Sequence, residues 1–220
     1  MGIFSYDSKF SQVLLRASQS CMLNAMWFAC SLPVITIGAS TTALYSVTLR
    51  IADDRDGELT KQFFRAFRDN FAQATRLWLI MLGAGIVLGT DGYITSRMRA
   101  ASTGVPAVLW TLNLALIIVL GIIWVIVMEY VFPLTAYVSN TDMEMLKNSF
   151  LIGIRYLFCS IMIFVIYFSM FFLVVAVFTP MIIFGVGLCA LLSSYLLIRV
   201  LRLCACSPNA EPEEEGTAEE

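Results

Sequence analysis

The sequence contains no histidine, and only 14% of its 220 residues are charged. Histidine is the commonest general base, the commonest metal ligand and the usual pH switch, so its absence removes three routes to chemistry. The chain also lacks the Walker A, G-x-S-x-G and H-E-x-x-H motifs of ATPases, hydrolases and metalloproteases. We therefore expect a protein that is not an enzyme, with no catalytic residue, no cofactor and no metal site.

Hydrophobic residues make up 59% of the chain, and the mean hydropathy is +0.82. The apolar residues form long runs, and a helix that crosses a bilayer needs about 20 of them in succession. A membrane β-barrel would show alternating apolar and polar residues over about 10 positions, which these runs do not. The sequence therefore predicts an all-α, polytopic transmembrane bundle whose main partner is the lipid bilayer, and nothing in it favours a nucleic-acid partner.

About five spans are predicted. The first apolar region covers residues 18–51 and contains Pro33 and Gly38, both of which interrupt helices. This region is either one long kinked span or two helical pieces, which would enter and leave on the same side. The other four predicted spans are 77–96, 105–128, 152–178 and 181–198, the last two joined by a tight hairpin at Thr179–Pro180.

An amphipathic helix is predicted between the first and second spans. Phe63, Phe67 and Phe71 recur at helical spacing, and Arg65 and Arg68 lie on other faces. Such a helix lies at a membrane interface, so we expect it to precede a turn into the bilayer. These five residues form the candidate partner surface, although a helix of this kind can also simply lie on lipid.

The break in the first region is the candidate broken-helix site. Pro33, Thr36, Gly38 and Ser40 combine hydroxyl groups with a loosened backbone, as at the binding sites of some transporters. Small residues also allow close helix packing in membranes, and packing is the reading that we favour here.

Two carboxylates fall within or at the ends of predicted spans. Asp91 lies late in the second span, and Glu129 lies at the cytoplasmic end of the third. Ionisable residues in membranes are costly and so are candidates for function. Near an interface, however, a carboxylate can remain hydrated, and Asp91 can pair with Arg97 or Arg99.

Basic residues indicate the orientation. Ten Lys and Arg residues fall on the side that holds segments 52–76 and 129–151, against two on the other side. The positive-inside rule then predicts a multi-pass protein of the cell membrane with a cytoplasmic C-terminus. Residues 1–206 form one predicted transmembrane domain, and the acidic segment 207–220 is predicted to be disordered.

Several segments resemble a known family. Residues 24–44, which include Leu-Pro-Val-Ile-Thr-Ile-Gly-Ala-Ser at 32–40, look like the N-terminal signature of the YesL family, as does Phe-Phe-Arg-Ala-Phe-Arg-Asp-Asn-Phe-Ala-Gln-Ala at 63–74. Segments 130–134 and 146–150 are similar to its second half. These are small bacterial membrane proteins of the class catalogued as domain of unknown function 624, and the resemblance covers about residues 2–200.

That family has no established activity. Its genes tend to lie beside carbohydrate ABC-transporter genes, so the resemblance implies an accessory role in sugar uptake, with a permease or membrane sensor as partner. The alternative is a small solute transporter or channel that acts on its own as an oligomer, with its path near Gly38 and Gly185.

Overall fold

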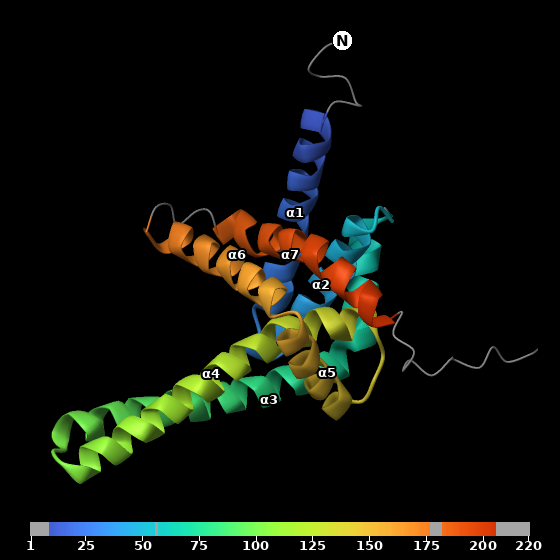
Figure 1. The fold of residues 1–220 in the computed structure, drawn as a ribbon. Helices are drawn as coiled ribbons and strands as arrows, with labels where there is room; N and C mark the ends of the chain where they lie inside the picture. Colours follow the sequence, from blue (N-terminus) through green and yellow to red (C-terminus); the bar gives the residue numbers. More distant parts are fainter. Residues whose placement is uncertain (1–8, 56, 177–181, 206–220) are drawn as a thin grey trace, which may run out of the picture.

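The computed structural model describes residues 9–55, 57–176 and 182–205, and every regular element in them is a helix (Figure 1). The helices are α1 (Lys9–Ser31), η1 (Val34–Thr36), α2 (Ile37–Ala52), α3 (Leu59–Ala101), α4 (Val105–Tyr137), α5 (Asp142–Arg155), α6 (Leu157–Ala176) and α7 (Ile182–Ala205). Among these described residues, five helical segments are long and apolar enough to cross a membrane, in α2, α3, α4, α6 and α7. The predicted all-α, multi-pass class is confirmed.

The first apolar region is two helical pieces, as one of the two readings predicts. Helix α1 ends before Pro33, and one 3-10 turn, closed by the bond from the Thr36 N–H to the Pro33 carbonyl (2.9 Å), leads into α2. Arg16 of α1 donates to the Asp54 carboxylate just after α2, at 3.0 Å. The two helices therefore form a hairpin, and its two ends return to the same side.

The amphipathic helix and the second span are one continuous helix, so the predicted turn between them is wrong. Helix α3 has 43 residues and is about 65 Å long at 1.5 Å per residue, whereas the hydrocarbon core is only about 30 Å thick. Residues 59–82 contain neither glycine nor proline, so nothing in the chain stops the helix where the apolar run begins. Helix α3 is therefore about twice as long as a perpendicular crossing of the hydrocarbon core requires.

The boundaries of the third and fourth spans also differ from those predicted. Helix α4 continues past residue 128 to Tyr137 and contains Pro133. The helix remains unbroken at Pro133 because of tertiary packing, since residues 130–135 are all buried. The chain then forms α5 and breaks at Tyr156, so α6 begins five residues later than the predicted span. The Thr179–Pro180 hairpin and the 207–220 tail lie outside the described residues.

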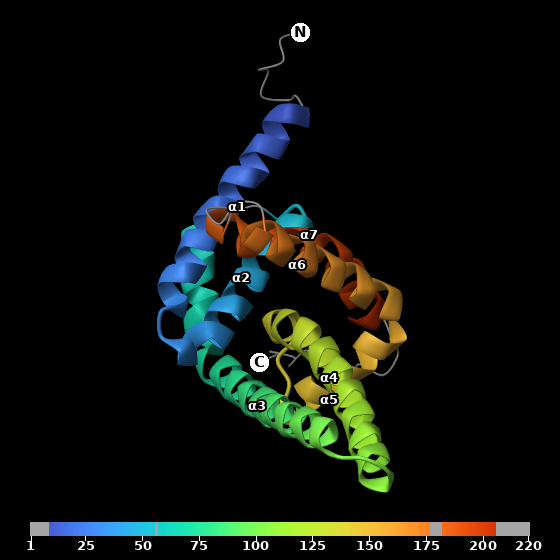
Figure 2. The same ribbon diagram turned by 90° about the vertical axis from the view of Figure 1, so that its left-hand side faces the viewer.

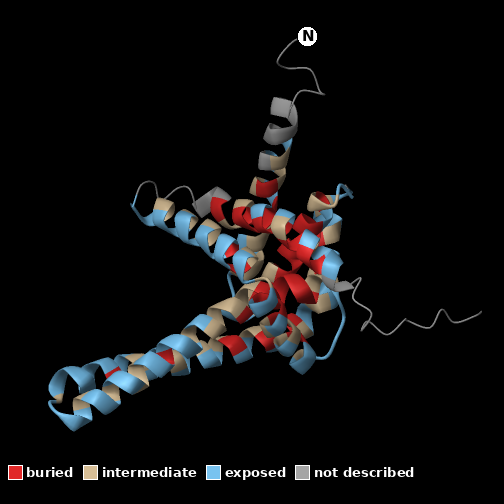
Figure 3. Ribbon diagram, viewed as in Figure 1, coloured by how far each residue is buried: buried red, intermediate tan, exposed pale blue. Residues whose placement is uncertain are grey.

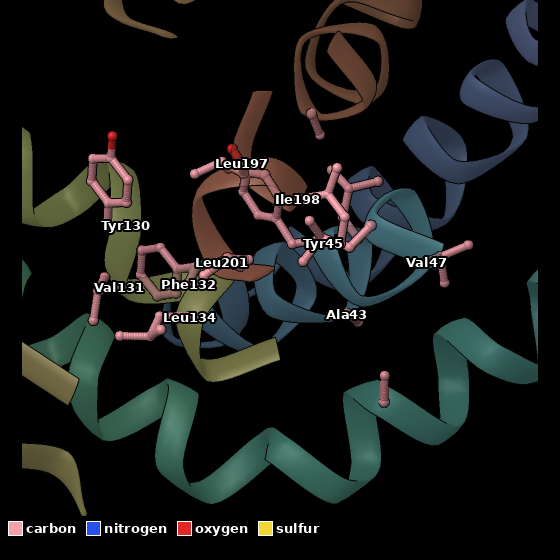
Figure 4. Packing of buried hydrophobic residues seen from close by; sticks show 14 of the residues in the cluster. Ala43, Tyr45, Val47, Tyr130, Val131, Phe132, Leu134, Leu197, Ile198 and Leu201 are labelled. Atoms are coloured by element: carbon pink, nitrogen blue, oxygen red, sulfur yellow. The ribbon is translucent and has the colours of Figure 1, made fainter. Parts of the chain in front are cut away.

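The core lies where α2, α4 and α7 meet (Figure 4). Tyr45 from α2, Val131 from α4 and Leu197 from α7 are among its buried members. Away from this centre, the outer halves of α3 and α4 and most of α6 carry exposed apolar side chains, shown pale blue in Figure 3. Apolar residues on that scale suit contact with lipid rather than with water.

Two glycines allow helices to approach closely. A Cβ atom at Gly38 would lie within 3.0 Å of the Ala74 carbonyl oxygen and of the Trp78 Cβ in α3. A Cβ atom at Gly187 would collide in the same way with the Ser20 carbonyl of α1. Helix α2 therefore packs backbone to backbone against α3, and α7 packs likewise against α1.

Ion pairs tie the ends of three helices together beside the hairpin. Asp53, whose side chain is only 4% exposed, pairs with Arg55 and with Arg202 near the end of α7. The neighbouring Asp54 has a left-handed backbone with φ of 53° and binds Arg16 of α1. The turn after α2 therefore fixes α1, α2 and α7 at one end of the molecule.

Candidate functional site

In the structure, some residues of the candidate partner surface on α3 lie in the core and others lie on the outside of the molecule. Phe63 is fully buried in the core, and Phe67 is half-buried against it. Phe63 is therefore unavailable as a surface anchor. Phe71 is 40% exposed, and its ring lies 5.5 Å from that of Phe67 in an edge-to-face arrangement.

Phe64, a residue that sequence reasoning passed over, takes the outward position. It is 49% exposed, and with Arg68 and Phe71 it follows the spacing i, i+4, i+7 that places side chains on one face of a helix. Arg65 is also exposed and has only a long contact, 3.7 Å, with Asp69. We call Phe64, Arg65, Arg68 and Phe71 the aromatic–basic stripe.

Polar contacts to α5 hold α3 near the stripe. Arg76 binds both carboxylate oxygens of Asp142, at 2.7 and 3.2 Å, and Gln73 donates to the Asn140 carbonyl at 2.6 Å. The hydrogen bond from Arg76 lowers the pKa of Asp142. These contacts join α3 to the start of α5, where Thr141 forms a capping box with its N3 residue.

At the broken-helix site, the hydroxyl groups are used within the hairpin itself. The Thr36 hydroxyl donates to the Cys30 carbonyl at 2.7 Å, and the Ser40 hydroxyl contacts the Ser31 hydroxyl at 2.6 Å. Gly38 is packed against α3, and the Trp78 indole N–H donates to the Val34 carbonyl at 2.8 Å. This arrangement supports helix packing rather than an open path at the break.

Asp91 belongs to a small polar cluster between α3 and α4. The Thr95 hydroxyl lies 3.4 Å from its carboxylate, and the Asn113 amide donates to that hydroxyl at 2.9 Å. Arg97, which the sequence offers as a partner for Asp91, donates instead to the Tyr93 hydroxyl at 3.2 Å. Among the described residues, no ion pair joins Asp91 to Arg97 or Arg99.

Glu129 lines a cavity of about 660 Å³ between α4 and α6. The two helices diverge here, with α3 and α4 on one side and α6 and α7 on the other, as Figures 1 and 2 both show. The Oε2 atom of Glu129 is buried and has no hydrogen-bond partner among the described residues. Sequence reasoning identified this carboxylate but had no signal for the cavity, because its walls come from segments about 30 residues apart.

The cavity wall is otherwise almost entirely apolar. Its members include Ile118, Ile122, Trp124, Ser160, Ile161 and Phe164. The Ser160 hydroxyl already contacts the Tyr130 hydroxyl and the Gly153 carbonyl, both at 3.0 Å. The indole N–H of Trp124 donates to the Met81 carbonyl at 2.9 Å. Glu129 is thus the polar group in this wall that is left for a ligand.

Within the described part of the chain, no group of three or more His, Cys, Asp or Glu side chains is placed to hold a metal ion. The four cysteines whose surroundings the structure describes, Cys21, Cys30, Cys159 and Cys189, are all free thiols.

A comparison with protein families matches residues 21–92 to the family described as "Protein of unknown function, DUF624". The match covers the second half of α1, all of α2 and most of α3, and it confirms the resemblance at the level of that family. Searches of curated proteins and of solved structures gave no significant match.

Proposed function

We propose that this protein is a non-enzymatic accessory of carbohydrate uptake, which binds an ABC-transporter permease or a membrane sensor in the bacterial cell membrane. Its cytoplasmic surface would make that contact. The family match gives no activity, so the proposal depends on the surface of the molecule and on the neighbourhood that the family resemblance implies.

The observation that carries the proposal is the aromatic–basic stripe on α3. Phe64 and Phe71 remain exposed beside two arginines, although the core lies directly beneath this helix. Aromatic and arginine side chains are enriched among the residues that dominate protein interfaces. The same helix continues without a break into a membrane span, so a partner bound at the stripe is rigidly connected to the bilayer segment.

The proposed orientation has the stripe, the ends of the hairpin and the C-terminus in the cytoplasm. The count of basic residues, ten against two, supports it. The Arg16–Asp54 ion pair adds that this part of α1 lies on the same side as the turn after α2. We therefore also propose a cytoplasmic N-terminus, because the hairpin enters and leaves on one side.

Affinity purification from native membranes in mild detergent, followed by mass spectrometry, tests the proposal. Wild-type protein should recover permease or sensor subunits in stoichiometric amounts. Arg68→Glu and Phe64→Ser should lose them while the protein remains inserted and monodisperse. Lys147→Glu is the matched control, because Lys147 is an exposed base on α5 outside the stripe.

Two results would contradict this role. If wild-type protein recovers only itself as a defined oligomer, autonomous transport becomes the better explanation. If the stripe variants fail to insert, whereas the Lys147 variant inserts normally, the stripe is a lipid contact.

The alternative of an oligomeric transporter gains no specific support at the break in the first region, since its hydroxyl groups are bonded internally. It remains testable by solute flux in liposomes. Saturable sugar flux by the purified chain would favour it over the accessory role.

A further inference from the structure

We propose that the cavity between α4 and α6 binds a lipophilic organic cation, with the Glu129 carboxylate as its counter-ion. This inference does not depend on the partner surface, which lies on α3. It begins from a carboxylate oxygen that is buried in an apolar wall without a hydrogen-bond partner. Such a group is costly inside a membrane unless a positive charge or a donor faces it.

The chain does not supply that partner itself. No described Lys or Arg side chain forms an ion pair with Glu129, and none lines the cavity. The nearby Ser160 hydroxyl is engaged with Tyr130 and Gly153. A cationic ligand bound in the cavity would supply the positive charge that the described side chains do not.

The remaining wall suits the body of such a molecule. Apolar side chains surround the carboxylate, and Trp124 and Phe164 add two aromatic rings. Aromatic rings attract cations, especially where water is excluded. The hydrogen bond from the Trp124 indole to the Met81 carbonyl fixes the position of that ring before any ligand arrives.

The size of the cavity favours a small molecule over a helix of another protein. Its volume of about 660 Å³ lies within the usual range for small-molecule sites, about 300–1,000 Å³. A single turn of helix with its side chains already occupies on the order of 500 Å³, and a spanning partner would need five or six turns. A phospholipid is also a poor match, since its acyl chains carry no charge and Glu129 would repel the phosphate of its headgroup, even where an ammonium group lies beside that phosphate.

The ligand has a route from the bilayer. Wall residues Ile118, Ile122 and Ile161 are 52–56% exposed, so the cavity opens onto the apolar surface of α4 and α6. A hydrophobic cation that has partitioned into the membrane can enter sideways without crossing water.

Binding of radiolabelled tetraphenylphosphonium to the full chain in phosphatidylcholine nanodiscs tests the proposal. We expect saturable binding, one site per chain, above that of empty nanodiscs. Radiolabelled tetraphenylborate, which has nearly the same shape and the opposite charge, should show no saturable binding when it is measured in separate samples. Glu129→Gln should weaken binding by about tenfold or more, whereas Asp91→Asn should leave it unchanged.

A second pair of variants tests the cavity without touching the carboxylate. Gly121 lines the cavity and a Cβ atom there would meet nothing within 4 Å, so Gly121→Leu should fill the site without disturbing the fold. Gly89→Leu is the control, because Gly89 has equally open surroundings in α3 and is not among the cavity-lining residues. We expect loss of binding for the Gly121 variant alone.

Three results would overturn the proposal. Wild-type protein could show no saturable binding, Glu129→Gln and Gly121→Leu could bind as well as wild type, or tetraphenylborate could bind equally well in its own samples. If purified protein does not bind the probe, but Ile122→Cys forms a disulfide in cells with a cysteine introduced into a permease subunit, the cavity is a contact site for a partner helix instead.

Discussion

Replacing Gly38 with alanine tests how tightly α2 packs against α3. The added methyl group would lie within 3.0 Å of a backbone oxygen of α3 and of the Trp78 Cβ, so the helices must move apart. Overpacking of this kind costs about 1–3 kcal/mol. Loss of the bond from the Trp78 indole to the Val34 carbonyl adds about 0.5–1.5 kcal/mol. The higher helix propensity of alanine returns about 1 kcal/mol, so we expect a net loss of about 0.5–3.5 kcal/mol.

The assay is thermal unfolding in detergent, followed by fluorescence-detected size-exclusion chromatography. A change of 1 kcal/mol shifts the Tm of a chain of this size by about 2–4 °C, so Gly38→Ala should lower it by about 1–14 °C. Gly89→Ala is the matched control: nothing lies within 4 Å of the added methyl group, so its Tm should stay equal to that of wild type or rise. If both variants have the Tm of wild type or higher, the close packing of α2 on α3 is wrong.

Four further predictions concern other contacts. Thr141→Ala removes the hydroxyl of the α5 capping box and should cost about 1 kcal/mol at neutral pH, measured as a lower Tm. The backbone N–H of Thr141 donates to the Glu144 carboxylate and so lowers the pKa of Glu144. The stabilisation from this hydrogen bond is therefore present at neutral pH and lost on acidification. Below about pH 4, the Tm of wild type should fall further than the Tm of Glu144→Gln. Arg76→Gln breaks an exposed ion pair with Asp142, so we expect an unchanged Tm but faster limited proteolysis of the loop at 138–141; an unchanged digestion rate would show that the pair does not restrain this loop. Gly187→Val drives a side chain into the α1 backbone and should lower the Tm through overpacking by about 1–3 kcal/mol, and a Tm equal to that of wild type would contradict the close approach of α7 to α1.

The sequence could predict those features that depend on local chemistry. Pro33 cannot donate a hydrogen bond and disfavours the helical conformation of the residue before it, so the break between α1 and α2 was readable from one residue. The length of the apolar runs alone predicts membrane-spanning helices, because a helix needs about 20 residues to cross a bilayer.

Features that depend on tertiary contacts were not readable in this way. The sequence becomes continuously apolar from residue 77, but no proline or glycine interrupts the backbone there, so α3 continues through this change in composition. Pro133 normally ends or kinks a helix, yet packing of the neighbouring Val131 and Leu134 in the core holds α4 together there. Phe63 and Phe64 are chemically identical, and only the position of the core decides which of them faces outward.

The continuity of α3 has a consequence for how its sequence can vary. Each residue of an α-helix advances the direction of the side chains by about 100°, so one residue inserted between Phe71 and Leu77 would swing the aromatic–basic stripe by that angle relative to the span. Seven inserted residues would restore its direction to within about 20°, while moving it about 10 Å farther from the membrane. The number of residues between the stripe and the span therefore sets the direction in which the stripe faces. Insertions or deletions in this segment should be tolerated only in steps close to whole helical turns.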